Sequence, residues 1–126
     1  MIIDSSFLIS FYDKDDSNHG KAVEILEKNR TRVLMAPEQV IGETATVILY
    51  KKGLNASKEF LSVIQQTENF QIIFTTGEDF SKTVEIYANQ KHQLSFIDAL
   101  VVYLAKKTGL DVLTFDKNMI KELNDE

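Results

Sequence analysis

The sequence has 126 residues, 44% of them hydrophobic, and a formal net charge of −5, so we expect residues 1–126 to form one compact domain. The absence of cysteine excludes disulfides, thiol nucleophiles and cysteine-bound zinc, and the net acidity argues against a protein that passively coats nucleic acid. The sequence shows neither a secretory signal pattern nor an apolar run of ~20 residues, and we therefore expect a cytoplasmic protein that does not cross a membrane.

Apolar runs typical of buried strands alternate with stretches of helical periodicity along the chain. In chain order, the pattern predicts a strand over 1–4, helices over 5–12 and 19–29, a strand over 32–36, helices over 37–52 and 56–67, a strand over 70–74, helices over 78–90 and 95–108, a strand over 111–115 and a short helix over 117–123. Pro37 fits the first turn of its helix, where a missing N–H costs nothing, and Gly53 and Gly109 stand where left-handed caps would end helices.

The predicted strands are almost entirely apolar, which is typical of a parallel sheet that helices cover on both faces. An antiparallel sheet with one wet face would alternate polar and apolar residues instead. The predicted fold class is therefore α/β, with three layers in the order α/β/α and a parallel sheet of four or five strands. No repeat or linker-like stretch divides the chain.

Four acidic residues stand where such a fold would gather them. Asp4 ends the first predicted strand and Asp116 follows the last, and ligands of open parallel sheets bind in the crevice beyond these carboxyl ends. Glu43 and Asp98 each share a helical stripe with apolar residues, so both are expected to face inward rather than toward bulk water. The four carboxylates could thus converge on one rim of the sheet.

Three of these acids also have a simpler interpretation as helix caps. Asp4 and Asp116 each precede a predicted short helix, and Ser95 with Asp98 fits the S-x-x-D capping box, a device that contributes about 1 kcal/mol. Glu43 stands inside a helix, where its alternative is a side chain that reaches outward from the helix flank.

A cluster of four carboxylates indicates a divalent cation, because unpaired acids at close range repel and raise one another's pKa. Oxygen ligands without cysteine favour Mg²⁺ or Mn²⁺ over Zn²⁺. His19 and His92 are far apart and lack ligand spacing, so we expect them at surface or loop positions.

Four segments of the chain carry a resemblance to a known family. They are IIDSS at 2–6, IGET at 41–44, LSFIDALVVYLA at 94–105 and VLTFDKNM at 112–119. In order and spacing they resemble the motifs of PIN-domain nucleases, and most closely those of the VapC-type ribonuclease toxins of bacterial and archaeal toxin–antitoxin pairs. The resemblance runs from residue 1 to about residue 120.

The resemblance implies a role for each matching residue. Asp4, Glu43, Asp98 and Asp116 would form the catalytic acidic quartet that binds Mg²⁺ or Mn²⁺, while Ser6 and Thr114 would orient the acids or their bound water. Met119 stands where the family often has an aromatic residue and Asn118 where it commonly has a second acid, so Asp116 is the weakest candidate for a direct ligand. Many relatives add a fifth strand, and the predicted sheet accounts for four.

The implied activity is hydrolysis of phosphodiester bonds in single-stranded or loop RNA by a metal-dependent endoribonuclease. The implied partners are a small antitoxin protein, whose tail would cover the acidic crevice, and a second copy of the chain in a homodimer. Candidate phosphate contacts, each equally explained as a solvated helix lysine, are Lys51, Lys52, Lys106, Lys107, Lys117 and Lys121.

Other functions remain as alternatives. A phosphatase with an aspartate nucleophile would show D-x-D, whereas this chain has DSS at 4–6, and a receiver domain would need an aspartate after the third strand, where TTG stands at 75–77. Another alternative is a catalytically silent PIN fold that serves as a binding module, although the presence of all four acids argues against it. The sequence does not separate a toxin from a housekeeping RNA-processing nuclease of the same fold.

Overall fold

A parallel sheet of four strands forms the centre of the computed structural model, which describes residues 1–125. The strands are β1 (Ile2–Ile3), β2 (Leu34–Pro37), β3 (Phe70–Ile73) and β4 (Val112–Leu113). Their order across the sheet is β3-β2-β1-β4, and Ile2 pairs with Met35 on one side and with Val112 on the other. The first strand therefore lies inside the sheet, and residues at its carboxyl end are flanked by those that follow β2 and β4.

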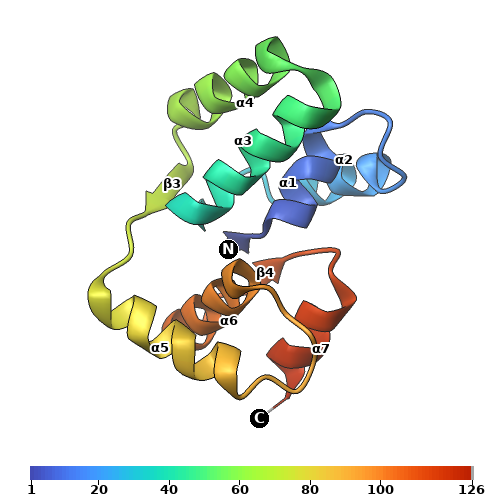
Figure 1. Ribbon diagram of the computed structural model, residues 1–126. Coiled ribbons are helices and arrows are strands. Elements are labelled where there is room, and N and C mark those ends of the chain that lie inside the picture. Colours follow the sequence, from blue (N-terminus) through green and yellow to red (C-terminus); the bar gives the residue numbers. More distant parts are fainter. Residues whose placement is uncertain (126) are drawn as a thin grey trace.

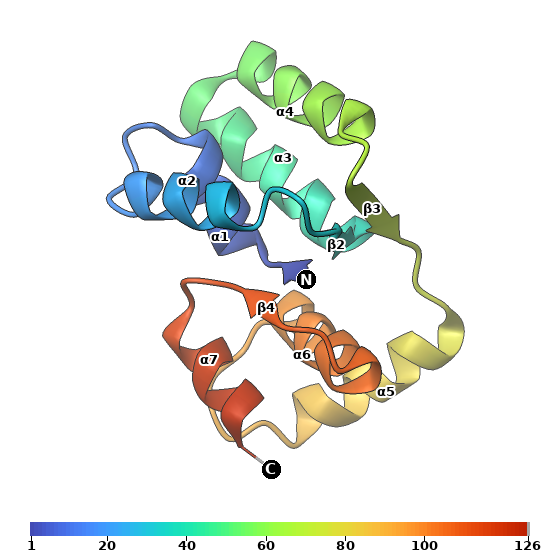
Figure 2. The ribbon, with the colours of Figure 1, turned by 180° about the vertical axis from the view of Figure 1, so that it is seen from behind.

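Helices cover both faces of this sheet. They are α1 (Ser5–Tyr12), α2 (His19–Lys28), α3 (Glu38–Lys52), α4 (Leu54–Gln66), α5 (Gly77–Ala88), α6 (Phe96–Thr108) and α7 (Lys117–Asn124). Figure 1 shows α1 to α4 on one side of the strands and α5 to α7 on the other, and Figure 2 shows the same division from behind. The predicted three-layer α/β/α class is confirmed, with the four-stranded form of the sheet. Among the described residues, no helix is long and apolar enough to span a bilayer.

The core lies between the sheet and its two helical layers. Ile2 and Ile3 of β1 are almost completely buried, and Phe7 of α1 and Phe60 of α4 are among the largest side chains without solvent exposure. In α6, the buried side chains that pack in the core are Leu100, Val101, Val102, Leu104 and Ala105. Burial of each such side chain contributes about 1.5–3 kcal/mol to the stability of the fold, so these residues hold the helical layers against the sheet.

Several element bounds differ from the sequence prediction. β1 and β4 are shorter than predicted, because the chain turns into helix α1 directly after Asp4 and leaves the sheet after Leu113. Pro37 was expected in the first turn of a helix; this prediction is wrong, since Pro37 ends β2 and Glu38 begins α3. His19 was expected on a surface or in a loop, yet it begins α2, where its Nδ1 lies 2.9 Å from the carbonyl oxygen of Ser10.

Two glycines end helices with positive φ. Gly109 ends α6 at φ 73° and ψ 12°, the left-handed conformation that the sequence predicted. Gly53 also has a positive φ of 96°, but its ψ of 173° lies outside the left-handed helical region, because the chain extends there before α4 begins.

Candidate active site

Asp4 occupies the centre of the candidate site, directly after β1. Its side chain is 1% exposed, and its backbone oxygen accepts the N–H of Leu8 at 3.1 Å as α1 starts. The carboxylate makes no cap hydrogen bond to α1, so the interpretation of Asp4 as a side-chain cap is wrong. Its Oδ1 is instead a buried oxygen without a hydrogen-bond partner among the described residues. A buried carboxylate oxygen without a hydrogen-bond partner costs free energy, so Oδ1 is a candidate atom for binding a ligand.

Two hydroxyl groups hold the other oxygen of Asp4. Ser6 Oγ donates to Asp4 Oδ2 at 2.8 Å, and Thr114 Oγ1 donates to the same oxygen at 2.9 Å. Ser6 Oγ also accepts the backbone N–H of Phe115 at 3.0 Å, and Thr114 Oγ1 accepts that of Asp116 at 3.0 Å. These contacts fix the orientation of the Asp4 carboxylate and connect β1 to the segment after β4.

Glu43 reaches the site from α3. Its side chain is half-buried, and Val40, three residues earlier in the same helix, is fully buried. Ser5 Oγ donates to Glu43 Oε1 at 3.2 Å. Burial raises the pKa of Glu43, the negative charges of Asp4 and Asp98 raise it further, and the hydrogen bond from Ser5 opposes them. The carboxylate therefore lies inward, and the alternative of an outward-reaching side chain does not hold.

Asp98 combines a cap with a position on the acidic rim. Ser95 Oγ accepts the N–H of Asp98 at 3.1 Å, and Asp98 Oδ2 accepts the N–H of Ser95 at 3.0 Å, so the predicted capping box of α6 is confirmed. Burial raises the pKa of Asp98, the hydrogen bond from Ser95 N–H lowers it, and the charges of Asp4 and Asp116 raise it. The cap uses Oδ2 and leaves Oδ1 of Asp98 available to a ligand.

Asp116 also acts as a helix cap. Its Oδ1 accepts the N–H of Met119 at 3.1 Å at the start of α7, as the cap interpretation predicted. Met119 is completely buried and packs in the core at the position where the family often has an aromatic side chain. Asp116 thus keeps one oxygen for the rim while the other stabilises α7.

Several of the four acids act on one another, since the charge of Asp4 raises the pKa of both Glu43 and Asp98, and that of Asp116 raises the pKa of Asp98. They are nevertheless spread along the rim. Within residues 1–125, the one group of three acids or histidines whose ligand atoms all lie within 4.8 Å is a different one, away from the quartet.

Two contacts of the site were absent from the sequence prediction. Ser5 orients Glu43, and the N–H of Phe115 anchors Ser6. The ring of Phe115 stacks on that of Phe7 with centroids 5.2 Å apart, which further fixes the segment after β4. The paired serines of DSS at 4–6 were the available signal, because adjacent serines at a strand end can serve two different acids.

The candidate phosphate lysines fall into two classes. Lys52 pairs with Asp13 at 3.0 Å, and Lys107 pairs with Asp79 at 3.0 Å, so both cations are already neutralised. No ion pair engages the other four candidates in the described part of the chain; they are Lys51, Lys106, Lys117 and Lys121. His92 lies in the loop between α5 and α6, as expected.

Comparison with known proteins assigns the fold to a family. The PIN domain family matches residues 1–125, and no curated protein sequence matches the chain. The crystal structure of VapC20 from Mycobacterium tuberculosis, a sarcin–ricin loop cleaving toxin, is similar with a TM-score of 0.85 and 22% identity over 95% of this chain and 92% of that one. PAE2754 from Pyrobaculum aerophilum is similar with a TM-score of 0.68 and 15% identity over 98% of this chain and 84% of that one. The chain therefore belongs to the PIN domain family.

Proposed function

We propose that this protein is a metal-dependent endoribonuclease that acts as the toxin of a toxin–antitoxin pair. The observation that carries the proposal is Asp4 Oδ1, a fully buried carboxylate oxygen with no hydrogen-bond partner among the described residues, at the carboxyl end of a central strand. Membership of the PIN domain family and the similarity to the VapC20 toxin support the same function.

The donors around Asp4 fit a hard divalent cation. The residues that would hold Mg²⁺, with Mn²⁺ as a substitute, are Asp4, Asp98, Glu43 and Asp116, which offer only carboxylate oxygens. Each of Asp4, Asp98 and Asp116 has one oxygen engaged by protein hydrogen bonds and the other uncommitted by them. When bound, such a cation would supply Lewis acidity toward a phosphodiester and an attacking water.

The surrounding side chains give the site its order. Ser6 and Thr114 hold Asp4 Oδ2 in place, so that Oδ1 keeps a fixed direction toward the rim. Glu43, whose pKa is raised by burial and by the charges of Asp4 and Asp98, is a candidate to accept a proton from the attacking water. Ser5 holds one Glu43 oxygen and leaves the second free for this transfer.

Lysines without an ion pair among the described residues would supply the positive charge that binds the RNA backbone. Lys117 directly follows Asp116, and Lys121 is one turn further along α7. Phosphate contacts from these side chains would position RNA without reading its sequence. VapC20 cleaves the sarcin–ricin loop, and a hairpin with that loop is therefore the first substrate to test for this protein.

Exposed apolar side chains support the proposed protein partners, an antitoxin and a second copy of the chain. One group lies on α3 and α4 and includes Tyr50, which is 83% exposed, and Leu54. A second group consists of the exposed Phe80 and Tyr87 on α5 with the half-buried Phe96 on α6, whose ring centroid lies 5.5 Å from that of Phe80 and 5.7 Å from that of Tyr87. Grouped apolar side chains of this kind mark interaction surfaces in many proteins.

The decisive experiment measures cleavage of the hairpin RNA with and without Mg²⁺. We expect cleavage by the parent to stop in EDTA and return with Mg²⁺, and to fall by about 100-fold or more in Asp4→Asn and Asp98→Asn. Asp111→Asn is the matched control, since Asp111 is an exposed acid at the start of β4, and it should cleave normally. Equal cleavage by all four proteins would refute the proposal.

Expression of the protein alone in a bacterial host separates the toxin from an RNA-processing nuclease. A toxin should arrest growth, and Asp4→Asn should not. RNA cleavage in vitro without growth arrest would leave the nuclease activity in place and remove the toxin role. Absence of Mn²⁺ binding that depends on Asp4 and Asp98 would indicate a silent binding module instead.

A further inference from the structure

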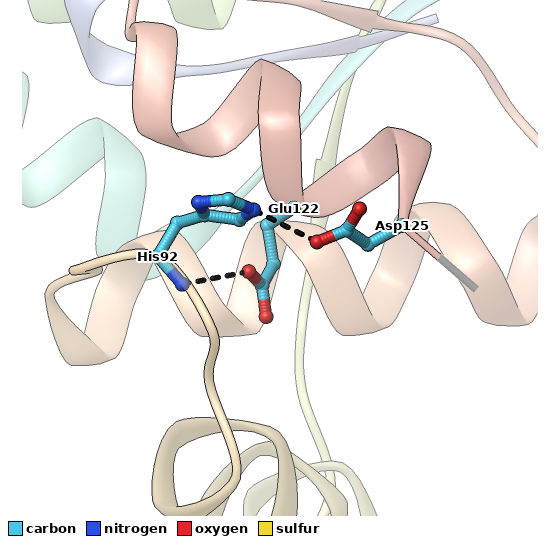
Figure 3. Close-up of side chains that lie close together, drawn as sticks. All are labelled: His92, Glu122 and Asp125. Carbon is cyan, nitrogen blue, oxygen red and sulfur yellow. Dashed lines mark hydrogen bonds and ion pairs between the residues drawn. The ribbon is translucent and has the colours of Figure 1, made fainter.

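A second group of metal-ligating side chains lies away from the acidic rim. It consists of His92, in the loop before α6, with Glu122 and Asp125 at the end of α7 (Figure 3). A ligand atom from each of the three residues lies within 4.8 Å of the other two. Figure 3 shows the His92 ring facing the Asp125 carboxylate, while the Glu122 carboxylate turns to the backbone N–H of His92.

Backbone hydrogen bonds fix Glu122 in this group. The side chain is 7% exposed, and its two oxygens accept the N–H groups of Lys91 at 3.2 Å and of His92 at 3.1 Å. Asn118, one turn earlier on α7, donates to the carbonyl oxygen of Gln93 at 3.0 Å and holds the same loop. A carboxylate oxygen has two lone pairs, so Glu122 can bind a cation while it keeps both backbone contacts. Outer contacts of this kind orient metal ligands in many sites.

The His92 ring and the Asp125 carboxylate are in direct hydrogen-bond contact. His92 Nε2 lies 2.8 Å from Asp125 Oδ2, and both residues are partly buried. Metal–nitrogen and metal–oxygen bonds of zinc measure about 2.0–2.2 Å, so a cation between these two atoms requires them to separate by only a few tenths of an ångström. Nε2 must then be deprotonated, and the cation takes the place of the shared proton.

A cavity of about 310 Å³ opens beside the group and is lined by Glu85, Asn89, Lys91, Lys106, Glu122 and Asp125. Its volume leaves room for the water molecules that complete the coordination of a cation with three protein ligands. Glu85 adds a third acid to the wall, and the exposed lysines have long side chains that can turn toward solvent. Glu85, Asn89 and Lys106, which line the cavity, take no part in the hydrogen bonds within the group.

We propose that His92 Nε2, Glu122 and Asp125 Oδ2 form a binding site for a transition-metal cation of the Zn²⁺ class. An imidazole nitrogen with two carboxylates suits Zn²⁺, Co²⁺ or Ni²⁺, whereas Mg²⁺ prefers oxygen ligands alone. The bound cation links the loop before α6 to the end of α7. Asp116 is the N-cap of α7 and Asp125 is its C-cap, so the site lies roughly 13 Å along the helix from the acidic rim at 1.5 Å per residue.

The test titrates the protein with Zn²⁺ by calorimetry in saturating Mg²⁺, which occupies the acidic rim if the proposed nuclease site is present. We expect one equivalent of Zn²⁺ to bind, with affinity reduced about tenfold or more in His92→Ala and in Asp125→Asn. His19→Ala is the matched control and should bind normally, because the His19 ring, at the start of α2, contacts the carbonyl oxygen of Ser10 and not a carboxylate. Asp98→Asn should also bind normally, which separates this site from the nuclease site.

A thermal melt provides the second measurement. Zn²⁺ should raise the melting temperature of the parent and of His19→Ala, but not that of His92→Ala, because a ligand stabilises only the folded state that binds it. Circular dichroism confirms that each variant is folded before titration. Binding that is absent from the parent, or equal in the parent and His92→Ala, would overturn the proposal and leave the group as an ion pair between loop and helix.

Discussion

Thr114 Oγ1 donates a hydrogen bond to Asp4 Oδ2 at 2.9 Å, although 110 residues separate them in the chain. Parallel pairing of β1 with β4 brings the two residues together, because Ile3 is opposite Leu113 and each strand ends directly afterwards. The contact therefore depends on the sheet, and the orientation of the Asp4 carboxylate depends on the contact.

Thr114→Val tests this dependence with little change in shape. Loss of one of two hydroxyl donors to a buried carboxylate should lower the free energy of unfolding by about 1.5–3 kcal/mol. Without that donor, Asp4 Oδ1 loses its fixed direction, and affinity for Mn²⁺ should fall about 10–100-fold. Chemical unfolding and calorimetric titration measure the two effects.

The control for this variant is Thr83→Val. Thr83 is also fully buried, but its hydroxyl donates to the carbonyl oxygen of Asp79 within its own helix. It should change stability and leave Mn²⁺ affinity unchanged. An equal loss of Mn²⁺ affinity in both variants would show that Thr114 acts through stability alone.

Ser95 and Asp98 form one capping box but should separate in function. Ser95→Ala removes the acceptor for the Asp98 N–H and should cost about 1 kcal/mol of stability with Mn²⁺ affinity nearly unchanged. Asp98→Asn keeps an oxygen for the Ser95 N–H and should retain the helix, yet Mn²⁺ affinity should fall at least about tenfold. Urea unfolding and calorimetry of both variants check this, and the opposite pattern would make Asp98 structural only.

The sequence alone predicted the local parts of this structure. Apolar runs identified all four strands, and the S-x-x-D spacing identified the box at Ser95, because both signals depend on residues that are neighbours in the chain. The position of each acid after a strand or on an inward helix stripe predicts that the quartet lies on one rim, and this stays a prediction.

Contacts between distant segments were not predictable in the same way. Ser5 and Glu43 form a hydrogen bond although they are 38 positions apart in the chain, and His92 and Asp125 do so at 33 positions apart. No spacing motif indicates either pair. Asp4 was expected to act as a cap as readily as a ligand, since a strand-end aspartate before a helix suits both roles. The Asp4 side chain makes no cap hydrogen bond and instead accepts from Ser6 and Thr114, which are contacts that exist only in the folded chain.

The raised pKa values of Glu43 and Asp98 predict how the metal-free protein responds to pH. Because the folded state holds these protons more tightly than the unfolded state, both groups favour folding most below their ordinary pKa values of 4.5 and 3.8. Their contribution is lost as the pH rises through the raised values. The ionised carboxylates thus destabilise the metal-free fold.

The double variant Glu43→Gln with Asp98→Asn should remove this effect. In EDTA, its free energy of unfolding relative to the parent should increase as the pH rises from about 4 to 7, as urea unfolding can measure. Mg²⁺ should stabilise the parent and not the double variant. A difference between the two proteins that is constant with pH would contradict the burial of these carboxylates.

The lowered pKa of Asp79 predicts a pH dependence of stability opposite in sign to that of Glu43 and Asp98. The N–H of Thr76 donates to its carboxylate at 2.9 Å and Lys107 pairs with it at 3.0 Å, and together they lower the pKa of Asp79 to about 2 from 3.8. A depressed folded pKa stabilises the fold above the unfolded value, and this contribution disappears as the pH falls from about 4 to 2.

Asp79→Asn should therefore cost about 1 kcal/mol at neutral pH, less than the pKa shift alone implies because Lys107 is half exposed and solvent screens the pair. The cost should fall to a small remainder near pH 2, where the Asp79 carboxylate of the folded parent is about half protonated. Lys82→Ala is the matched control, since Lys82 and Glu85 form an exposed pair at 3.6 Å whose removal should change stability by less than about 0.5 kcal/mol. Guanidinium unfolding at a series of pH values measures all three proteins, and a cost of Asp79→Asn that persists undiminished at pH 2 would show that packing of the side chain, and not its charge, stabilises the start of α5.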